Sequence, residues 1–315
     1  MTINTYSTFA SSNIFAPSPP SRFRRLISNP CLFIAQWLYT HQPPISTSLP
    51  PARPIKVVCI SDTHNLQPLL PQGDILIHAG DLTVNGTFVE LQAQLSWLNS
   101  LPHGHKVVIA GNHDVLLDPT YLQRNSRAIG LETYLKDLDW GDVIYPENEA
   151  RVLDVRGRSW RIYGSPMTPK YGNWAFQYEA SADVWRNTIP EKTDILVTHG
   201  PAKGHLDFMN GVSHGCPKLL RELWRVKPRL HVFGHIHAAR GIKHAHWRWL
   251  RWRYDAVCRG EGGIGVIFMM LVVWASTWLL HACGKKTEAT TTSVNAAVVG
   301  DWGLAEGEES TVVEI

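Results

Sequence analysis

Five short apolar runs in the middle of the chain alternate with polar stretches, and each is rich in Val, Ile and Leu, as a buried strand is. The runs cover residues 56–60, 74–78, 106–110, 194–197 and 230–233. Polar residues that can bind metals follow each run. Because ligands of open α/β sheets bind beyond the carboxyl ends of the strands, the five runs are expected to deliver these side chains to one edge.

The residues around these runs predict further elements of an α/β domain. Leucines recur at three- and four-residue spacing over residues 88–98, which predicts a structural helix packed on the sheet. Residues 152–155 and 160–163 flank a polar turn and predict a hairpin. Near the end of the chain, residues 290–299 and 311–315 have the composition of two more strands.

The metal-ligand residues after the apolar runs form five motifs. They are Asp62-Thr63-His64, Gly80-Asp81, Gly111-Asn112-His113-Asp114, Thr198-His199-Gly200 and Gly234-His235-Ile236-His237. Taken singly, each motif is more typical of a polar turn than of a site. Together and in this order they resemble the calcineurin-like metallophosphoesterases, over roughly residues 55–240. The sequence around these motifs is most similar to that of the metallophosphoesterase-domain subgroup related to class III cyclic-nucleotide phosphodiesterases.

The donor atoms of these motifs are two carboxylates, one amide oxygen and four imidazoles, without a thiolate. Such a set suits Mn, Fe, Zn or Mg better than soft metals. The resemblance implies two divalent ions, with Mn favoured, and a bridging hydroxide as the nucleophile. It places one ion among Asp62, His64, Asp81 and His237, and the other among Asp81, Asn112, His199 and His235, so that Asp81 is the bridge.

The resemblance gives His113 a catalytic role of its own. Its imidazole would contact a phosphate oxygen and protonate or stabilise the leaving group, for which a titration near neutrality is suitable. From the residues alone, we add the hypothesis that Asp114 orients the ring of His113.

The fold implied by the resemblance is a four-layer α/β/β/α sandwich, here with a C-terminal apolar insertion. The expected reaction is hydrolysis of a phosphodiester, a cyclic nucleotide or another small diester. A phosphoprotein substrate is disfavoured because Leu82-Thr83-Val84 follows Gly80-Asp81, where phosphoprotein phosphatases have Asp-Arg-Gly. Two alternatives stay open: a phosphomonoesterase, and a nucleotide- and metal-binding module at a membrane surface with little turnover.

Composition adds few constraints on partners. The chain has 315 residues and a formal net charge of +3, which gives no case for specific binding of nucleic acid. Its five cysteines are scattered without the spacing of a disulfide framework or a zinc site. We therefore expect a reducing, cytoplasmic location, and the sequence carries no indication of an oligomeric state.

Segments on either side of the core differ from it in composition. Residues 1–54 are rich in Pro and Ser and are expected to be mostly disordered. Within them, the apolar run 31–39 follows three arginines, so it is a targeting segment, a patch packed on the domain or a weak interfacial contact. The core would then extend over residues 55–241, with a membrane-associating segment at 242–286 and terminal strands at 287–315.

Residues 262–284 contain no Asp, Glu, Lys or Arg, and about 20 apolar residues can cross a bilayer. A basic, Trp-rich run at residues 243–259 precedes them and would favour anionic lipid. Strands that return to the core sheet afterwards would conflict with a single crossing. The alternatives are an interfacial or re-entrant excursion, a single span, and a helix buried on the domain or in a dimer.

Several other side chains have two readings. Tyr171, Trp174, Phe176 and Tyr178 have a spacing that would allow stacking on a nucleobase, although packing is the commoner role of such aromatics. His205 and His214 lie in the polar loop 203–216 after His199, and solvated loop histidines are commoner there than contacts to phosphate.

Overall fold

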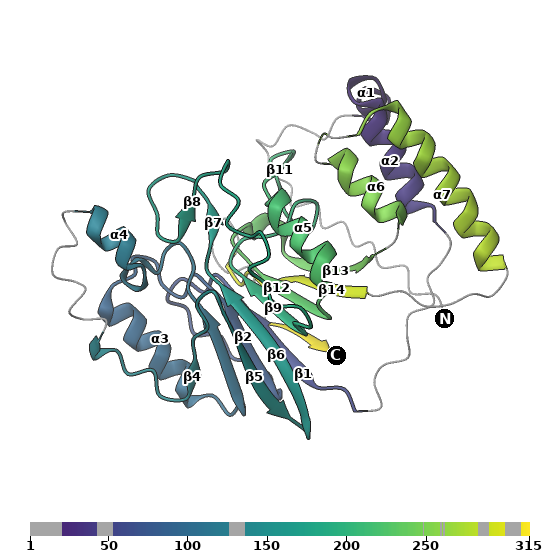
Figure 1. Ribbon diagram of the computed structural model, residues 1–315. Coiled ribbons are helices and arrows are strands. Elements are labelled where there is room, and N and C mark those ends of the chain that lie inside the picture. Colours follow the sequence, from purple (N-terminus) through teal and green to yellow (C-terminus); the bar gives the residue numbers. More distant parts are fainter. Residues whose placement is uncertain are drawn as a thin grey trace.

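The computed structural model describes residues 21–42, 53–125, 136–247, 249–258, 260, 262–282, 290–299 and 310–315. They form an α/β fold with two mixed sheets (Figure 1). The first sheet has the order β15 (Thr311–Glu314), β1 (Lys56–Ile60), β2 (Ile75–Ala79), β3 (His105–Ile109) and β4 (Val143–Ile144). In it β1 to β4 are parallel and β15 is antiparallel to β1.

The second sheet is built in the same way from later parts of the chain. Its order is β13 (Gly241–His246), β14 (Thr290–Asn295), β12 (Leu230–Phe233), β9 (Ile195–Thr198), β6 (Arg158–Ser165) and β5 (Glu149–Val155). The four central strands are parallel, whereas β13 and β5 are antiparallel edges. The predicted core strands, the hairpin and the two terminal strands are therefore confirmed.

Alternate residues of the central strands bury opposite faces of each sheet. Val57 and Cys59 of β1 pack in a core that also contains residues of the second sheet, whereas Val58 lies in a cluster with α3 (Phe88–Ser100). In the second sheet, Leu196 packs with α5 (Pro217–Val226). This two-sided burial explains the uninterrupted apolar composition of the strands, which is typical of parallel sheets.

Short elements occupy the loops beyond the strands. They are η1 (Val115–Leu117), α4 (Pro119–Arg124), β7 (Thr168–Pro169), β8 (Gln177–Tyr178), β10 (Phe208–Met209), β11 (Val212–Ser213) and η4 (His237–Ala239). The predicted helix is α3, and its first turn is fixed by a capping box in which Thr87 and Glu90 bind each other's backbone N–H groups.

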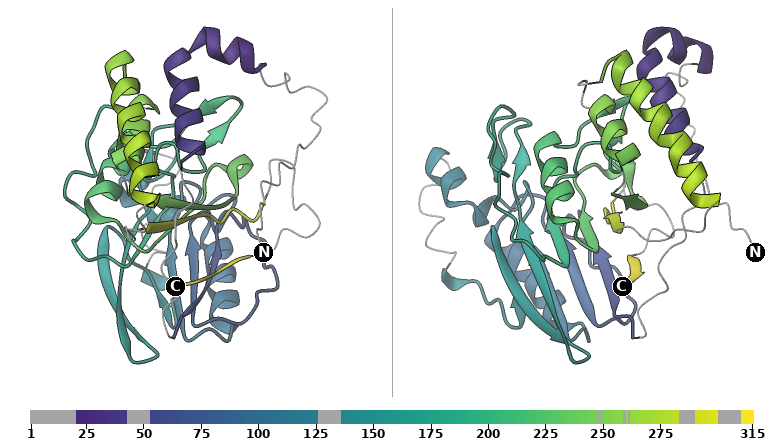
Figure 2. Two further views of the ribbon diagram at one scale, coloured as in Figure 1. Left: turned by 90° about the vertical axis from the view of Figure 1, so that its right-hand side faces the viewer. Right: turned by 45° about the vertical axis from the view of Figure 1, so that its right-hand side comes forward.

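Four helices from both ends of the chain form a separate helical unit beside the second sheet (Figures 1 and 2). They are α1 (Arg22–Ser28), α2 (Pro30–Thr40), α6 (Trp249–Cys258) and α7 (Ile264–Ala282). The common core of α2, α6 and α7 contains Ala35, Leu38, Leu250, Val257, Ile267 and Met270. The apolar run 31–39 is thus part of a helix that packs against α6 and α7. The predicted disorder of residues 1–20 and 43–52 lies outside the described residues.

A buried charged cluster joins α6 to the body of the protein. Arg251 Nε lies 2.8 Å from Asp255 Oδ1, and Arg251 Nη2 lies 2.7 Å from His205 Nε2. The indole of Trp224 on α5 donates to Asp255 Oδ2 over 2.9 Å. The expectation that His205 is a solvated loop histidine is therefore wrong, because His205 is completely buried beside Arg251 of α6. His214 is exposed, as expected.

The single-span alternative for the C-terminal segment is wrong on topological grounds. The strands on either side of α6 and α7, β13 and β14, pair with each other from Gly241↔Asn295 to His246↔Thr290. Both ends of the segment consequently lie on the same side of any bilayer. Among the described residues, we find no helix whose length and apolar character would allow it to cross a membrane.

Candidate metal centre

The predicted metal ligands lie beyond the carboxyl ends of the parallel strands, where the two sheets meet. The first sheet supplies Asp62 and His64 after β1, Asp81 after β2 and Asn112 after β3, and the second supplies His199 after β9 and His235 and His237 after β12. Two sheets that face each other thus contribute opposite sides of one site.

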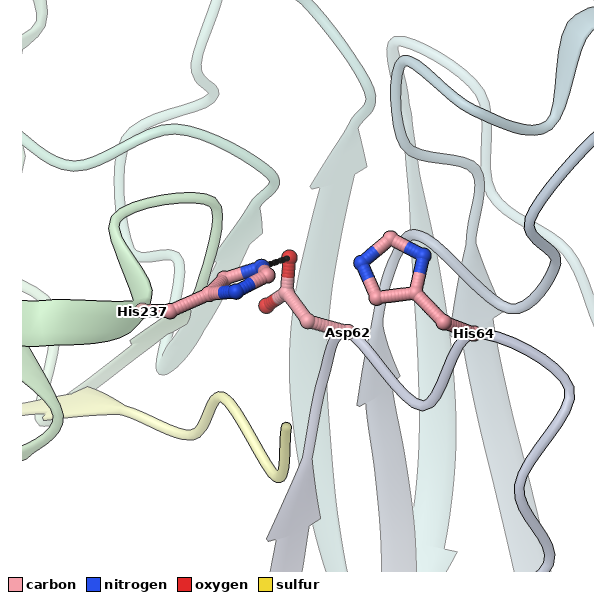
Figure 3. A group of neighbouring side chains, drawn as sticks. All are labelled: Asp62, His64 and His237. Atoms are coloured by element: carbon pink, nitrogen blue, oxygen red, sulfur yellow. Dashed lines mark hydrogen bonds and ion pairs between the residues drawn. The ribbon is translucent and has the colours of Figure 1, made fainter. Parts of the chain in front are cut away.

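The side chains gather in three overlapping groups whose possible ligand atoms lie within 4.8 Å of one another. The groups are Asp62 with His64 and His237, His64 with Asp81 and His113, and Asp81 with His199 and His235. Figure 3 shows the first group, in which the rings of His64 and His237 lie on either side of the Asp62 carboxylate. Asn112 joins through its Oδ1, which lies 3.1 Å from His199 Nε2. Asp81 therefore belongs to two groups and lies between them.

Backbone carbonyls orient two of the imidazoles. Nδ1 of His64 lies 3.1 Å from the Thr83 carbonyl, and Nδ1 of His199 lies 2.9 Å from the Ala79 carbonyl. When Nδ1–H donates to a carbonyl, Nε2 keeps a lone pair for a metal, which is the usual arrangement of a ligating histidine. The Nε2 atoms of both rings face Asp81, at 3.9 and 3.4 Å.

The electrostatics of the site favour positive charge. Burial lowers the pKa of His64, and it lowers that of His235 to about 4, so both rings are neutral donors at neutral pH. Burial also disfavours a charged His199, but the Asp81 carboxylate outweighs this effect and raises the pKa of His199 to about 9. For Asp62, burial opposes ionisation, yet its hydrogen bond with His237 and the charge of His199 hold its pKa below the usual value. A divalent cation would supply the same stabilisation to both carboxylates.

Contacts across the two sheets hold Asp62 in place. The backbone N–H of His235 donates to the Asp62 carboxylate over 3.0 Å, and His237 Nε2 lies 3.2 Å from Asp62 Oδ1. Asp62, His64, Asp81 and His235 have φ values of 54°, 44°, 54° and 67°, in the left-handed region that non-glycine residues seldom adopt. Such strain is concentrated at functional sites, where the surrounding structure maintains it.

His113 and Asp114 lie beside the predicted ligands. The Asp114 carboxylate, however, does not hydrogen-bond the His113 ring as we expected. Nδ1 of His113 lies 2.8 Å from the Val84 carbonyl, which therefore orients the ring. The buried carboxylate of Asp114 instead accepts hydrogen bonds from the N–H groups of Gly111, Leu82 and Thr83 and from the Thr83 hydroxyl. Burial raises the pKa of Asp114 to about 6. The hypothesis that Asp114 orients His113 is thus replaced by a role in fixing the two ligand loops.

Sequence reasoning missed a pair of buried histidines that support the ligand loops. His78 Nε2 lies 2.9 Å from the hydroxyl of Thr63, which stands between the predicted ligands Asp62 and His64. In the second sheet, His231 Nε2 lies 2.9 Å from the hydroxyl of Thr198, directly before His199. Both histidines are inside strand runs, where an imidazole among apolar residues was the signal that could have found them.

The donor set fits divalent metal ions. Oxygen and imidazole donors without thiolate suit Mg, Mn, Fe or Zn. Moreover, Asp62 and Asp81 are both almost completely buried, and buried carboxylates need a paired charge or a metal.

Comparisons with known proteins agree with this site. A family model described as calcineurin-like phosphoesterase matches residues 55–239. The chain is 39% identical over 215 residues to the human "Metallophosphoesterase domain-containing protein 1", covering 59% of this chain and 62% of that protein. It is 40% identical over 301 residues to "Probable rhamnogalacturonate lyase C" of Emericella nidulans, covering 94% of this chain but 28% of that protein.

The chain therefore spans less than two thirds of the length of these relatives. Among solved structures, the phosphopantetheinyl hydrolase of Mycobacterium tuberculosis superposes with a TM-score of 0.37 at 19% identity, over 60% of this chain and 84% of that one. The match of the family model over the whole metal centre, together with the geometry of the ligands, identifies the chain as a member of the calcineurin-like phosphoesterase family, whose chemistry is metal-dependent phosphoester hydrolysis.

Proposed function

We propose that this protein hydrolyses small phosphodiesters, cyclic nucleotides among them, at a centre of two divalent metal ions. The observation that carries the proposal is the position of Asp81, whose carboxylate lies within 4.8 Å of possible ligand atoms in two groups of histidines, His64 with His113 and His199 with His235. One carboxylate between two sets of imidazoles is the arrangement that a bridged pair of metals requires. The finer architecture that goes with it is the four-layer α/β/β/α sandwich, with α6 and α7 as its C-terminal apolar insertion.

The two ions would have separate ligands apart from Asp81. Asp62, His64 and His237 would complete one set, and Asn112, His199 and His235 the other. Mn is the metal that we favour. When bound, the ions would polarise the phosphoryl group and lower the pKa of a water molecule, so that hydrolysis can occur at neutral pH.

The contribution of His113 is to the leaving group. Because its Nδ1 lies 2.8 Å from the Val84 carbonyl, its Nε2 is the nitrogen that can face a substrate. Its backbone N–H donates to Asp81 Oδ1 over 2.8 Å, which fixes the ring beside the predicted bridge. From there the imidazolium form of His113, which carries a proton on both ring nitrogens, can donate Nε2–H to a phosphate oxygen or protonate the departing alkoxide, a contribution of about 10²–10⁴ in rate.

Hydrolysis of chromogenic esters tests the proposal. With purified protein and Mn²⁺, we expect bis(p-nitrophenyl) phosphate to be turned over with a higher kcat/KM than p-nitrophenyl phosphate, and turnover to stop when a chelator removes the metal. A preference for the monoester would favour a phosphomonoesterase. Nucleotide binding without turnover of either ester would favour the membrane-surface binding module.

We also propose that the helical unit attaches the protein to an anionic membrane surface by lying in the interface. Helix α7 carries no Asp, Glu, Lys or Arg, and Ile264, Phe268 and Leu279 expose 84%, 67% and 69% of their surface. On α1, Phe23 and Ile27 are 71% and 66% exposed, and this helix also contains three arginines and no acidic residue. Apolar side chains beside basic ones are what a helix at an anionic interface presents.

Charge on the exposed face of α7 should weaken this attachment. We expect Phe268→Glu combined with Val272→Glu to lower the affinity for phosphatidylserine-containing vesicles by about tenfold or more, since a buried Phe or Val contributes roughly 1.5–3 kcal/mol. Cosedimentation with vesicles measures the effect. Gln123→Glu, at an exposed position of α4 outside the helical unit, is the control for added negative charge. Equal binding by the double variant, or dimerisation through α7 in light scattering, would contradict the proposal.

A further inference from the structure

One aromatic side chain outside the ligand motifs lies directly against the candidate catalytic histidine. The ring centroids of Trp174 and His113 are 4.2 Å apart, with an angle of 34° between the ring planes. His113 also meets the ring of His64 edge-on, with the ring centroids 4.8 Å apart. The imidazole therefore contacts both a predicted metal ligand and an indole.

The backbone around Trp174 is fixed to the third ligand motif. The N–H of Ala175 donates to the carbonyl of Asn112 over 3.2 Å, and the N–H of Phe176 donates to Asp118 Oδ2 over 2.7 Å. Phe176 has a φ of 53°, so the chain turns sharply directly after the indole. These contacts give Trp174 a defined position relative to Asn112 and His113, which a free surface loop would not have.

The neighbouring aromatic side chains do not contact the site in this way. Phe176 and Tyr178 are buried and pack in the clusters that cover the two sheets. Tyr171 is 72% exposed. Trp174 is half-buried, so part of its surface is covered by the site while another part is accessible. Of the four aromatics of this stretch, Trp174 is the one with a ring contact to a candidate site residue.

We infer that Trp174 is a specificity-determining residue that forms an aromatic wall on the leaving-group side and favours phosphoesters with a planar aromatic group, such as a nucleoside base or an aryl ring. The inference rests on the proposed role of His113. Since Nε2 of His113 is the nitrogen available to the leaving group, a group that departs toward it passes beside the indole. Stacking on an aromatic side chain is tolerant of the exact ring, because every base has a π-face.

Binding of two unreactive phosphonates to the Mn²⁺-loaded protein tests the inference without relying on turnover. Phenylphosphonate and methylphosphonate offer the same head group to the metal centre and differ in the aromatic ring. We expect calorimetry to give an affinity about tenfold higher for phenylphosphonate, a preference that Trp174→Leu removes and Trp174→Phe largely keeps. Tyr171→Leu is the matched control and should keep the preference.

The outcomes separate this inference from the proposed function. No preference in the wild type, or a preference that survives in Trp174→Leu, would overturn the inference. An equal loss of affinity for both phosphonates in Trp174→Leu would also overturn it, since the indole would then merely support the site. A clear aryl preference that depends on Trp174, in a protein that hydrolyses no ester, would support the role of Trp174 in binding aromatic groups. The same result would refute the proposed hydrolase activity.

Discussion

Replacing Asp81 by asparagine is expected to reduce metal-dependent phosphoester hydrolysis by about a thousandfold or more. The substitution keeps the shape of the side chain but removes the charge that lies between the two groups of histidines. Metal-assisted stabilisation of a phosphoryl transition state is worth several kcal/mol, and each 1.36 kcal/mol is tenfold in rate. The measurement is kcat/KM for a chromogenic ester in the presence of Mn²⁺.

Metal binding itself provides a second readout for this variant. A ligand at a hundredfold excess over its Kd stabilises the folded state by about 2.7 kcal/mol, so Mn²⁺ should raise the Tm of the wild type by several degrees. We expect this rise to be largely lost in Asp81→Asn. Asp183→Asn is the control, because Asp183 pairs with Arg221 and Arg186 outside the metal centre. Turnover within tenfold of the wild type in Asp81→Asn would refute a bridging role for this carboxylate.

The meeting of the ligands at one edge could be predicted because each follows its strand directly. Asp62, Asp81 and Asn112 come two or three residues after β1, β2 and β3, so the parallel pairing of these strands brings them to one edge. His199 directly follows β9 of the second sheet and joins them because the two sheets face each other. Local sequence determines both the strand and the position of the side chain at its end. Their membership of compact groups could therefore be predicted from the sequence.

The partners of the ligands could not be predicted in the same way. The carbonyls of Thr83, Ala79 and Val84 orient His64, His199 and His113, and every residue type has a carbonyl. Asp114 looked like the partner of His113 because the two are adjacent in sequence. In the structure its carboxylate is instead satisfied by N–H groups of two loops, which depends on how the loops approach each other.

The helical unit depended on long-range packing that composition does not reveal. Residues 31–39 and 262–284 were each left with several alternatives, of which packing on the domain was one. In the structure, α2 and α7 come from opposite ends of the sequence and pack against each other. Similarly, residues 241–246 form an edge strand of the second sheet, where His244 and Lys243 obscured its pattern. The Lys243 ammonium group on this strand donates to the carbonyl of Gly204 over 2.7 Å, a contact with a loop that is distant in the sequence.

Substituting alanine for Gly111 is expected to disrupt the metal centre by steric clash alone. This glycine is not in the left-handed region, but a Cβ there would overlap Oδ1 and the backbone nitrogen of Asp81 and lie 2.7 Å from Cε1 of His199. The backbone nitrogen cannot rotate away, so the loop after β3 and the loop after β2 must separate. We expect a loss of about 1–3 kcal/mol in stability, as for other overpacked sites, and a loss of about a hundredfold in kcat/KM, since a displacement near 1 Å can cost that much.

Gly104→Ala is the matched control, because Gly104 precedes the same strand at its other end and a Cβ there would be 3.6 Å from the Asp74 carbonyl, an ordinary contact. We expect it to retain the Tm, the Mn²⁺-induced rise in Tm and the turnover of the wild type. If Gly111→Ala behaves like this control, Asp81 and His199 have room to move apart without loss of function. If it retains the fold but loses the Mn²⁺ effect, then the close approach of the two ligand loops, and not only the identity of the ligands, is what makes this edge of the two sheets a metal centre.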